Sequence, residues 1–503
     1  MYKNRLRLSA LAVGLFTSVS SMATTLEVCN TCAHLTVQDA VTNAVAGDTI
    51  FIRNGTYNEH DIEVDKRLTF LGESQSGTII DAQNNGRHFA ILESADAVAF
   101  DNITLKNGDS RQSTMNCGSF TTHQGGSICA KHVSIKLWQM KFEDNKSGNI
   151  GGAIYLMGDN ATSGYLVAGE SSFIGNSIPG PGSGGGGGGA IACSYCDVLE
   201  IEGSEFVKNS ADTDSLFNPG TKVGIGGAIA IWGTNKIESQ RNVYDSNYAH
   251  DGGGAMSIGP YIGMNDRSKI VNDTFQSNLT PGVGGAIMGY DGTGSGDLAI
   301  FRSTFVKNVA SSGGALHSTA SFYIDNSTFT ANNADEFGGA IRINSAYKPF
   351  EIANSTFHGN SVDDSDHGSV ISTYALLQTG DIKISNSIFF ENDGIECDTG
   401  GGGFVVGEHN LTDTDSCDPA NGANSAPYGY TLPFSLGQVT DFDTNLANNG
   451  GFTMTHAIGA GSNAISNAAR DCPSSIRPGQ LLRRDQRGFN RDKKCDIGAY
   501  EYQ

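Results

Sequence analysis

Phe329-Thr330-Ala331-Asn332, followed by Gly338-Gly339-Ala340-Ile341, is one copy of a unit that recurs along the middle of the chain. Successive copies begin between 24 residues (305 to 329) and 38 residues (206 to 244) apart. A period in this range is typical of an array in which each unit packs against its neighbours. The repeats therefore predict one elongated stack instead of several globular domains. The first position of each copy is aromatic: Phe142, Phe173, Phe206, Tyr244, Phe275, Phe305, Phe329, Phe357 and Phe389.

Each residue type in the unit has a structural role in a coil made of short strands. We expect the aromatic side chains to stack in a column, and the Asn of each copy to occupy a turn and bond the backbone of adjacent coils. The Gly pair permits a tight corner before the next strand. A second Asn, at positions 326, 354 and 386, predicts a second internal ladder. The shortest interval, 24 residues, fits three short strands and three turns, whereas propeller blades of about 40–50 residues fit poorly.

The region before the repeats predicts the first coils and a cap. Apolar residues at 37, 40, 41, 44 and 45 have the spacing of a short amphipathic helix, which would close the open end of the stack. Gly47-Asp48-Thr49-Ile50 and Asn54-Gly55-Thr56-Tyr57 resemble the first segment of secreted pectate-lyase-like β-helices. We therefore predict an all-β, right-handed parallel β-helix over residues 24–395, with a short N-terminal capping helix. This fold carries both enzymes and adhesins.

The central repeats, from about residue 125, resemble those of chlamydial polymorphic outer-membrane proteins, which share the Phe-x-x-Asn and Gly-Gly-Ala-Ile pair. The resemblance implies a β-helix at the outer membrane or cell surface, and adhesion as its role.

After Asn392 the repeat fades, and residues 396–503 carry other motifs. Together these motifs resemble the choice-of-anchor Q domain found at the ends of bacterial secreted β-helix proteins. In that family a membrane or wall anchor usually follows. This chain ends two residues after Glu501, so we expect no such anchor. The motifs are Gly407 to Leu411, Leu446 to Ala457, Gly461 to Ile465, Asp485 to Gly488 and Cys495 to Glu501.

The N-terminus has the features of an export signal. Lys3, Arg5 and Arg7 form a basic region, and Leu8 to Phe16 is an apolar stretch too short to span a bilayer. Small residues before Thr24 fit a cleavage site, so residues 1–23 should be removed. We expect a protein that is secreted or held on the outer surface of a bacterium, with no transmembrane anchor after signal cleavage.

The ten cysteines agree with export, because an even number behind a signal peptide favours structural disulfides. The two Cys-x-x-Cys pairs lack the second ligand pair of a zinc site and the βαβ surroundings of a redox motif. Neighbours in sequence need not be bonded partners, so the connectivity stays open. In sequence the cysteines fall into five close pairs: Cys29/Cys32, Cys117/Cys129, Cys193/Cys196, Cys397/Cys417 and Cys472/Cys495.

The charge balance excludes some partners. The 503 residues include 32 Lys and Arg against 53 Asp and Glu, a formal net charge of −21 at pH 7. Nucleic acids and anionic lipids need a basic surface, so we expect neither as a partner. We expect no organic cofactor, and Ca²⁺ is the one candidate ion because carboxylates are its usual ligands.

The polar residues that stand out from the repeat are His317 and Arg342. Each follows the Gly-Gly-Ala-Leu/Ile of its copy, so the two should be neighbours on one sheet, about 4.8 Å apart. A His beside an Arg could act as base and substrate clamp, with Asp363, Asp364 and Asp366 at the corner to bind Ca²⁺ or a sugar. The other interpretation is an exposed polar pair beside a solvated acidic loop.

Two functions remain open from the sequence. The first is adhesion, in which a secreted or cell-surface β-helix binds an extracellular glycan or a surface protein. The alternative is a polysaccharide lyase or glycoside hydrolase of the pectate-lyase-like class. Nearly every repeated residue has a packing role, which favours binding over catalysis. Function is then expected in the parts that do not repeat, namely the insertions 177–187 and 210–225 and the pair His317 and Arg342. The sequence does not specify the oligomeric state.

Overall fold

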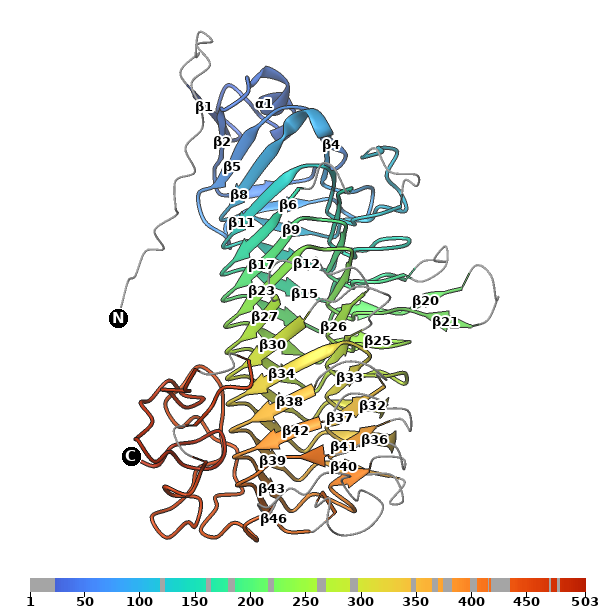
Figure 1. Ribbon diagram of the computed structural model, residues 1–503. Coiled ribbons are helices and arrows are strands. Elements are labelled where there is room, and N and C mark those ends of the chain that lie inside the picture. Colours follow the sequence, from blue (N-terminus) through green and yellow to red (C-terminus); the bar gives the residue numbers. More distant parts are fainter. Residues whose placement is uncertain are drawn as a thin grey trace.

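The chain forms a right-handed parallel β-helix, whose stacked coils are seen side-on in Figure 1. Each coil contributes one strand to each of three long parallel sheets, which we name A, B and C in the order in which the chain visits them. The fold class predicted from the repeats is therefore confirmed. The computed structural model describes residues 23–117, 123–159, 164–179, 186–215, 221–259, 268–289, 297–344, 350–363, 370–373, 382–398, 405–414, 416–417, 435–469, 472–476 and 480–503.

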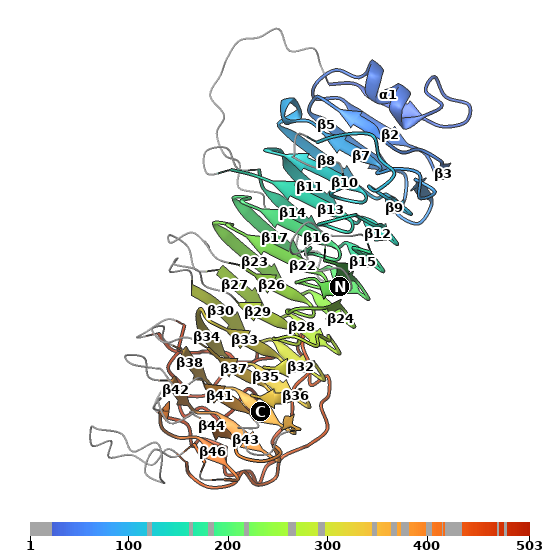
Figure 2. The same ribbon diagram turned by 90° about the vertical axis from the view of Figure 1, so that its right-hand side faces the viewer.

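The strands of a coil follow one another from sheet A to B to C, and Figure 2 shows strands of all three sheets after a quarter turn of the molecule. Sheet A holds β1 (Thr25–Val28), β2 (Thr49–Ile52), β5 (Leu68–Gly72), β8 (Ala97–Asp101), β11 (Ser134–Trp138), β14 (Leu166–Gly169), β17 (Val198–Glu202), β23 (Lys236–Gln240), β27 (Ser268–Val271), β30 (Asp297–Phe301), β34 (Ser321–Asp325), β38 (Phe350–Ala353), β42 (Ile382–Ser385) and β45 (Val405–Val406). Sheet B holds β3 (Gly55–Tyr57), β6 (Thr78–Asp81), β9 (Thr104–Lys106), β12 (Lys141–Glu143), β15 (Ser172–Ile174), β18 (Glu205–Val207), β24 (Val243–Asp245), β28 (Thr274–Gln276), β31 (Thr304–Val306), β35 (Thr328–Thr330), β39 (Thr356–His358), β43 (Ile388–Phe390) and β46 (Leu411–Thr412). Sheet C holds β4 (Ile62–Val64), β7 (Phe89–Ile91), β10 (Ile128–Lys131), β13 (Ile154–Met157), β16 (Ile191–Ser194), β22 (Ile229–Trp232), β26 (Met256–Ile258), β29 (Ile287–Gly289), β33 (Leu316–Ser318), β37 (Ile341–Ile343), β41 (Ile371–Thr373) and β44 (Cys397–Asp398).

The repeated aromatic residue lies at the centre of each sheet B strand and points into the coil. The nine rings form one continuous column, with centroids of successive rings 4.6 to 5.0 Å apart. This spacing equals the distance between neighbouring strands, so the column follows directly from the parallel pairing. The predicted aromatic stack is confirmed.

The repeated Asn forms the predicted ladder at the turn from sheet B to sheet C. Asn308 is typical: its Nδ2 donates to Oδ1 of Asn332 (2.9 Å) and to the carbonyl of Phe275 (3.0 Å). Its own Oδ1 accepts from the backbone N–H and the Nδ2 of Asn278. Since the turn lies inside the coil, these amides satisfy backbone groups that water cannot reach.

The second ladder runs through a different residue from the one predicted. Asn326, Asn354 and Asn386 adopt left-handed backbone conformations at the turn from sheet A to sheet B. The side chain that bonds the preceding coil belongs to the following residue, usually Ser, as where Ser355 Oγ accepts from the Ser327 backbone N–H (3.2 Å). The prediction for positions 326, 354 and 386 was wrong because the left-handed turn directs their side chains away from the coil interior.

The predicted capping helix is α1 (Val37–Asn43), at the N-terminal end of the stack in Figure 1. Thr36 begins it, with its hydroxyl accepting from the Asp39 backbone N–H. Val37, Ala40 and Val41 are buried, so the helix closes the first coil as the apolar spacing indicated. One short 3-10 helix, η1 (Glu93–Ala95), lies between β7 and β8.

The stack extends beyond the boundary predicted at residue 395. β44, β45 and β46 add a further strand to each of the three sheets, so coils continue to Thr412. At the turn from sheet A to sheet B, Asn410 takes the place of the ladder serine, and its Oδ1 accepts from the Ser387 backbone N–H. The extra coil lacks the Phe and Gly-Gly signals, which is why the sequence pattern does not reveal it.

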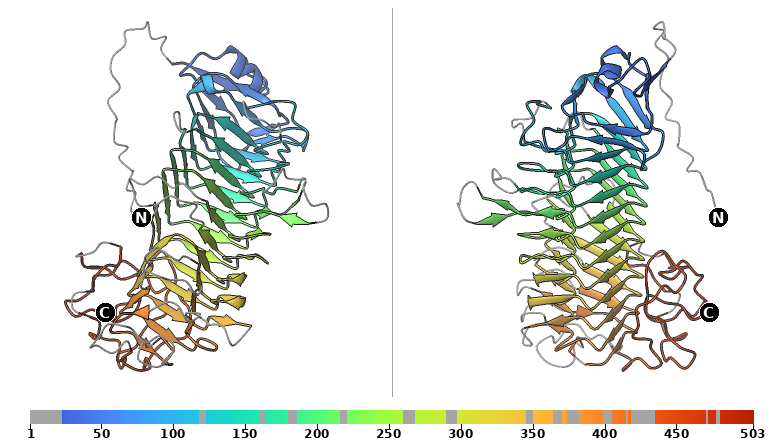
Figure 3. Two further views of the ribbon diagram at one scale, coloured as in Figure 1. Left: turned by 45° about the vertical axis from the view of Figure 1, so that its right-hand side comes forward. Right: turned by 180° about the vertical axis from the view of Figure 1, so that it is seen from behind.

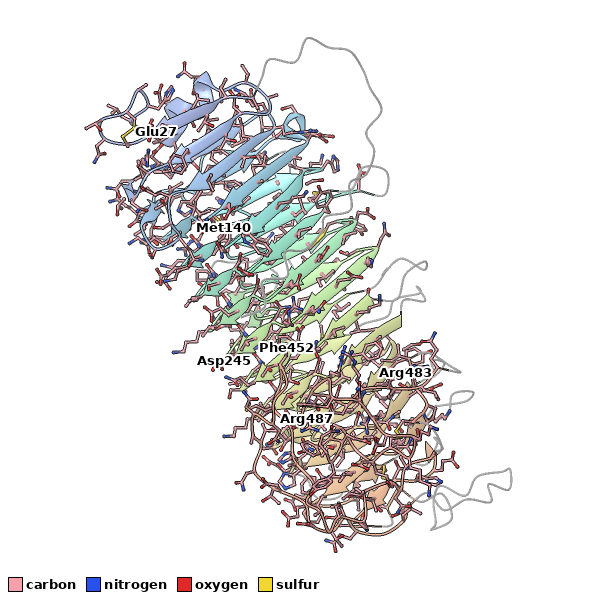
Figure 4. All side chains as sticks on the ribbon, turned by 90° about the vertical axis from the view of Figure 1, so that its left-hand side faces the viewer. Glu27, Met140, Asp245, Phe452, Arg483 and Arg487 are labelled. Atoms are coloured by element: carbon pink, nitrogen blue, oxygen red, sulfur yellow. A yellow bond between two sulfur atoms is a disulfide. The ribbon has the colours of Figure 1, made fainter. Side chains whose placement is uncertain are left out.

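Residues 435–503, called the C-terminal segment here, fold back along the outside of the stack (Figure 3). The three left-handed Asn residues hold this segment: Asn326 donates to the Arg484 carbonyl, Asn354 to that of Pro473 (3.4 Å), and Asn386 accepts from the Ala469 N–H. Phe452 of the segment, labelled in Figure 4, has its ring centre 5.4 Å from the guanidinium carbon of Arg241, just before β24. The motifs after residue 435 thus have a packing role on coils far earlier in the chain.

Additional short strands lie at the corners of the stack, and five disulfides cross-link the chain. β19 (Ser210–Ala211) pairs with β25 (Tyr248–Ala249), and β32 (Val309–Ser312), β36 (Asn333–Phe337) and β40 (Ser361–Val362) form a small parallel sheet. β20 (Thr213–Asp214) and β21 (Lys222–Val223) form a hairpin that projects from the stack in Figure 1. Across the described residues, no helix has the length and apolar character needed to cross a membrane. The disulfides join the sequence neighbours: Cys29–Cys32, Cys117–Cys129, Cys193–Cys196, Cys397–Cys417 and Cys472–Cys495.

Candidate functional site

The outer face of sheet C carries one row of side chains that changes from coil to coil. Alternation along each strand sets this row: in β33, Leu316 and Ser318 are fully buried, whereas His317 between them points outward. Register pairing places the equivalent residues side by side. From the first strand to the last, the row reads Glu63, Ala90, Cys129, Tyr155, Ala192, Ala230, Ser257, Met288, His317, Arg342, Ser372 and Asp398.

His317 and Arg342 are direct register partners on β33 and β37. Their backbones are therefore one strand spacing apart, about 4.8 Å. The alternative of an exposed polar pair was wrong, because Arg342 is only 7% exposed and His317 is largely buried. Burial, reinforced by the charge of Arg342, lowers the pKa of the His317 imidazole to about 4. His317 is thus neutral at neutral pH, and its Nδ1 has no hydrogen-bond partner among the described residues.

Arg342 is held in place by its neighbours on both sides. Its guanidinium carbon lies 4.3 Å from the centre of the Phe337 ring, and its Nη1 donates to Ser372 Oγ on the next coil. Ser372 Oγ in turn donates to Oδ2 of Asp398 (3.5 Å). The structure therefore joins His317, Arg342, Ser372 and Asp398 into one polar row.

Asp398 was missed by the sequence analysis. It belongs to the last coil, where the repeat has faded, and follows Cys397 in the place of the usual Ile. The spacing of Glu396-Cys397-Asp398 after Asn392 was the only available signal.

Beyond Glu63 on the first strand, the N-terminal part of the same row, from Ala90 to Ala230, is mainly apolar. Tyr155 is 4% exposed and packs with Ala192 and the Cys117–Cys129 disulfide. Met157 and Trp232 adjoin this cluster from the strand ends. Sheet C thus presents aromatic and sulfur-containing side chains on its N-terminal coils and hydrogen-bonding side chains on its C-terminal coils.

The predicted calcium ligands are not brought together by the described part of the chain. Asp363 is exposed and accepts from Asn333 Nδ2 (3.4 Å), while Asp364 and Asp366 lie outside the described residues. No group of three or more His, Cys, Asp or Glu side chains suited to a metal ion occurs among the residues described. The two insertions do stack on one corner as expected, with bridges from Ser177 to Ser210 and from Gly187 to Ile225. Their central residues, 180–185 and 216–220, lie outside the described ranges.

One carboxyl group with an unusual pKa lies near the polar row but cannot contact a substrate. Burial and the adjacent Asp413 raise the pKa of Glu396 to about 10. Its side chain is fully buried under the last coil, where Oε2 accepts from Thr414 Oγ1 (2.9 Å). Glu396 is therefore a structural group of the C-terminal end of the stack.

Comparison with known proteins gives structural likeness without sequence likeness. No protein-family model matches the chain, and no curated protein matches it in sequence. An alginate lyase of the PL6 family superposes with a TM-score of 0.51 at 12% identity, over 92% of this chain and 60% of that one. The catalytic domain of a GH87 α-1,3-glucanase in complex with nigerose gives a TM-score of 0.41 at 12% identity, over 72% and 68% of the two chains. A pectin methylesterase from Yersinia enterocolitica gives 0.25 at 15% identity, over 49% and 81%.

The likeness to the alginate lyase agrees with the architecture seen in the strand pairing. The chain spans about 60% of the length of the alginate lyase. At this identity the comparison shows a common pectate-lyase-like parallel β-helix and leaves the chemistry to the residues of this chain.

Proposed function

We propose that the protein is an exported enzyme that cleaves an acidic polysaccharide by β-elimination at a uronate residue. The observation that carries the proposal is the register pairing of a partly buried, neutral His317 with Arg342 on the outer row of sheet C. The β-helix shared with an alginate lyase supports the choice of a polysaccharide as substrate class. The proposal thus follows the alternative from the sequence analysis.

The two side chains fit the two requirements of this reaction. Arg342 would bind the uronate carboxylate, which neutralises its charge and makes the proton on the adjacent ring carbon more acidic. The imidazole of His317, neutral and only partly buried, would accept that proton. The electron pair forms a ring carbon–carbon double bond, the bond to the glycosidic oxygen breaks, and that oxygen takes a proton from the imidazolium or from water.

Hydrolysis fits the row less well. Glycosidases use two carboxyl groups on either side of the scissile bond, less than about 10 Å apart. Among the described residues of the outer row, the carboxylates are Glu63 and Asp398, on the first and last strands of sheet C. They are too far apart to act on one glycosidic bond.

The test is turnover of alginate, polygalacturonate and hyaluronan by the full chain, with and without Ca²⁺. We expect ultraviolet absorbance from the unsaturated product, and its loss in His317→Ala and Arg342→Ala. Ser257→Ala, on the same row two strands before His317, is the matched control and should keep the activity. New reducing ends without the absorbance, or full activity in both variants, would contradict the proposal.

Glycan binding or adhesion without turnover is the second candidate, favoured by the resemblance of the repeats to surface adhesins. Retention of the acidic polysaccharides by the wild type, with no product over long incubation, would support it. Export through the signal at residues 1–23 and a surface role for a choice-of-anchor Q-like region belong to both candidates. Fractionation of the producing cells tests the location.

A further inference from the structure

A groove of about 460 Å³ lies on the outer face of sheet A, away from the polar row of sheet C. Its floor is made by Ala97 and Ala99 of β8, whose register neighbours are larger. Ala99 lies between Thr69 of β5 and Lys136 of β11, and Ala97 pairs with Ser134 of β11. Two alanines between longer side chains leave the middle of the face empty. The volume falls within the range usual for small-ligand sites, about 300–1,000 Å³.

The walls of the groove are polar and include two cations. Lys136 is exposed, and its register neighbours, Ala99 and Val167, carry no charge. Arg67 stands on the opposite side, where it is paired with Asp96, and both side chains are more than half exposed. In a chain with a net charge of −21, this local placement of cations would attract an anionic group.

Aromatic rings lie on either side of Lys136. The Lys136 ammonium is 5.8 Å from the centre of the Tyr165 ring, which lines the groove. Trp138, two residues further along β11, is 39% exposed and lies against Gly169 of the next coil, where an added Cβ would be 2.2 Å from the indole. A Cβ at position 169 would displace the ring, so the glycine leaves the space that the indole occupies.

We infer that this groove is a second binding site, for an acidic oligosaccharide. The apolar faces of the sugar rings would lie against Trp138 and Tyr165, while a carboxylate of the sugar contacts Lys136 and Arg67. Such a site needs no catalytic group, because its role is to hold a polysaccharide on the side of the stack. In Figure 1 the strands β5, β8 and β11 lie near the N-terminal end, whereas the C-terminal segment covers coils near the other end. None of the described residues of the C-terminal segment lines the groove.

The experiment measures binding of trigalacturonate and of its methyl ester to the full chain by calorimetry. Lys136→Gln should weaken trigalacturonate binding by about fivefold, the upper effect of an exposed charge pair, with little effect on the neutral ester. Trp138→Ala should weaken binding of both ligands. Lys383→Gln is the matched control, and this variant should bind trigalacturonate as tightly as the wild type does. Lys383 is exposed on the same row of sheet A, in β42, seven strands beyond β14, which holds Val167.

The inference shares only its ligand class with the proposed function, and Arg342→Gln separates the two. In Arg342→Gln, turnover should disappear while trigalacturonate binding remains. Adding Lys136→Gln to this variant should then weaken the remaining binding. Equal affinity of the wild type and Lys136→Gln for trigalacturonate would overturn the inference, as would absence of binding in the wild type. Loss of all binding in Arg342→Gln would overturn it too, because the only site would then be on sheet C.

Discussion

The Asn ladder allows one prediction about stability to be worked out from its contacts. Replacing Asn308 by Ala removes four hydrogen bonds in the fully buried turn of its coil. Two of the lost bonds leave donors of Asn278 without an acceptor, its backbone N–H and one proton of its Nδ2. A buried donor without a partner costs about 1–3 kcal/mol. We therefore expect the variant to lose about 4 kcal/mol of unfolding free energy.

Asn392→Ala is the matched comparison, because Asn392 closes the same ladder at a partly exposed position. It also accepts two hydrogen bonds, from the N–H and Nδ2 of Asn360, but water can replace it there. We expect its cost to be about half that of Asn308→Ala. Urea unfolding, followed by the fluorescence of the two tryptophans and by circular dichroism, gives both values. If Asn308→Ala costs no more than Asn392→Ala, burial does not set the strength of the ladder and the reasoning fails.

Three further predictions concern buried groups. Burial raises the pKa of the Asp325 carboxyl from 3.8 to about 6. Docking of the C-terminal segment through the hydrogen bonds of Ser474 and Ser475 to Asp325 should therefore be strongest below about pH 4 and weaken as the pH rises through 6. Hydrogen exchange of residues 480–503 should show this pH dependence, and Asp325→Asn should abolish the pH dependence. Burial likewise raises the pKa of the Asp273 carboxyl, to about 7. Because the wild-type carboxyl is charged at pH 8 and neutral at pH 4, Asp273→Asn should raise the melting temperature at pH 8 and change it little at pH 4. An equal effect at both pH values would contradict the raised pKa. Gly498→Ala places a Cβ 2.7 Å from the Ile388 side chain at a residue with a φ of +98°. The variant should lose about 2 kcal/mol of the free energy that holds the C-terminal segment on the stack, which makes the segment more sensitive to protease. An unchanged digestion rate would contradict the contact between Gly498 and Ile388.

The repeat predicted the interior of the coils well because its information is local. Phe329 and Asn332 have fixed places in one coil, and stacking identical coils brings each residue against its own equivalent. The same logic predicts His317 beside Arg342, and the register of β33 and β37 confirms it. Wherever the contact partner is the same position in the next copy, spacing alone specifies the contact.

Contacts between unlike parts of the chain have no such periodicity. Asn326 has the same sequence surroundings as a ladder residue, yet its side chain binds Arg484 and Arg491 from the C-terminal segment. The degree of burial of the His317 and Arg342 pair was equally hidden, because it depends on the surroundings of the sheet and not on its register.

The sequence by itself determined the coil, its aromatic column, its Asn ladder and the order of side chains on each face, since these follow from the alternation of a strand and a repeat of fixed length. The tertiary structure alone decided where the C-terminal segment lies, that the coils continue to Thr412, and that His317 is partly buried and neutral. Those features depend on which surfaces meet across a hundred or more residues, and burial sets both the hydrogen bonds and the charges found there.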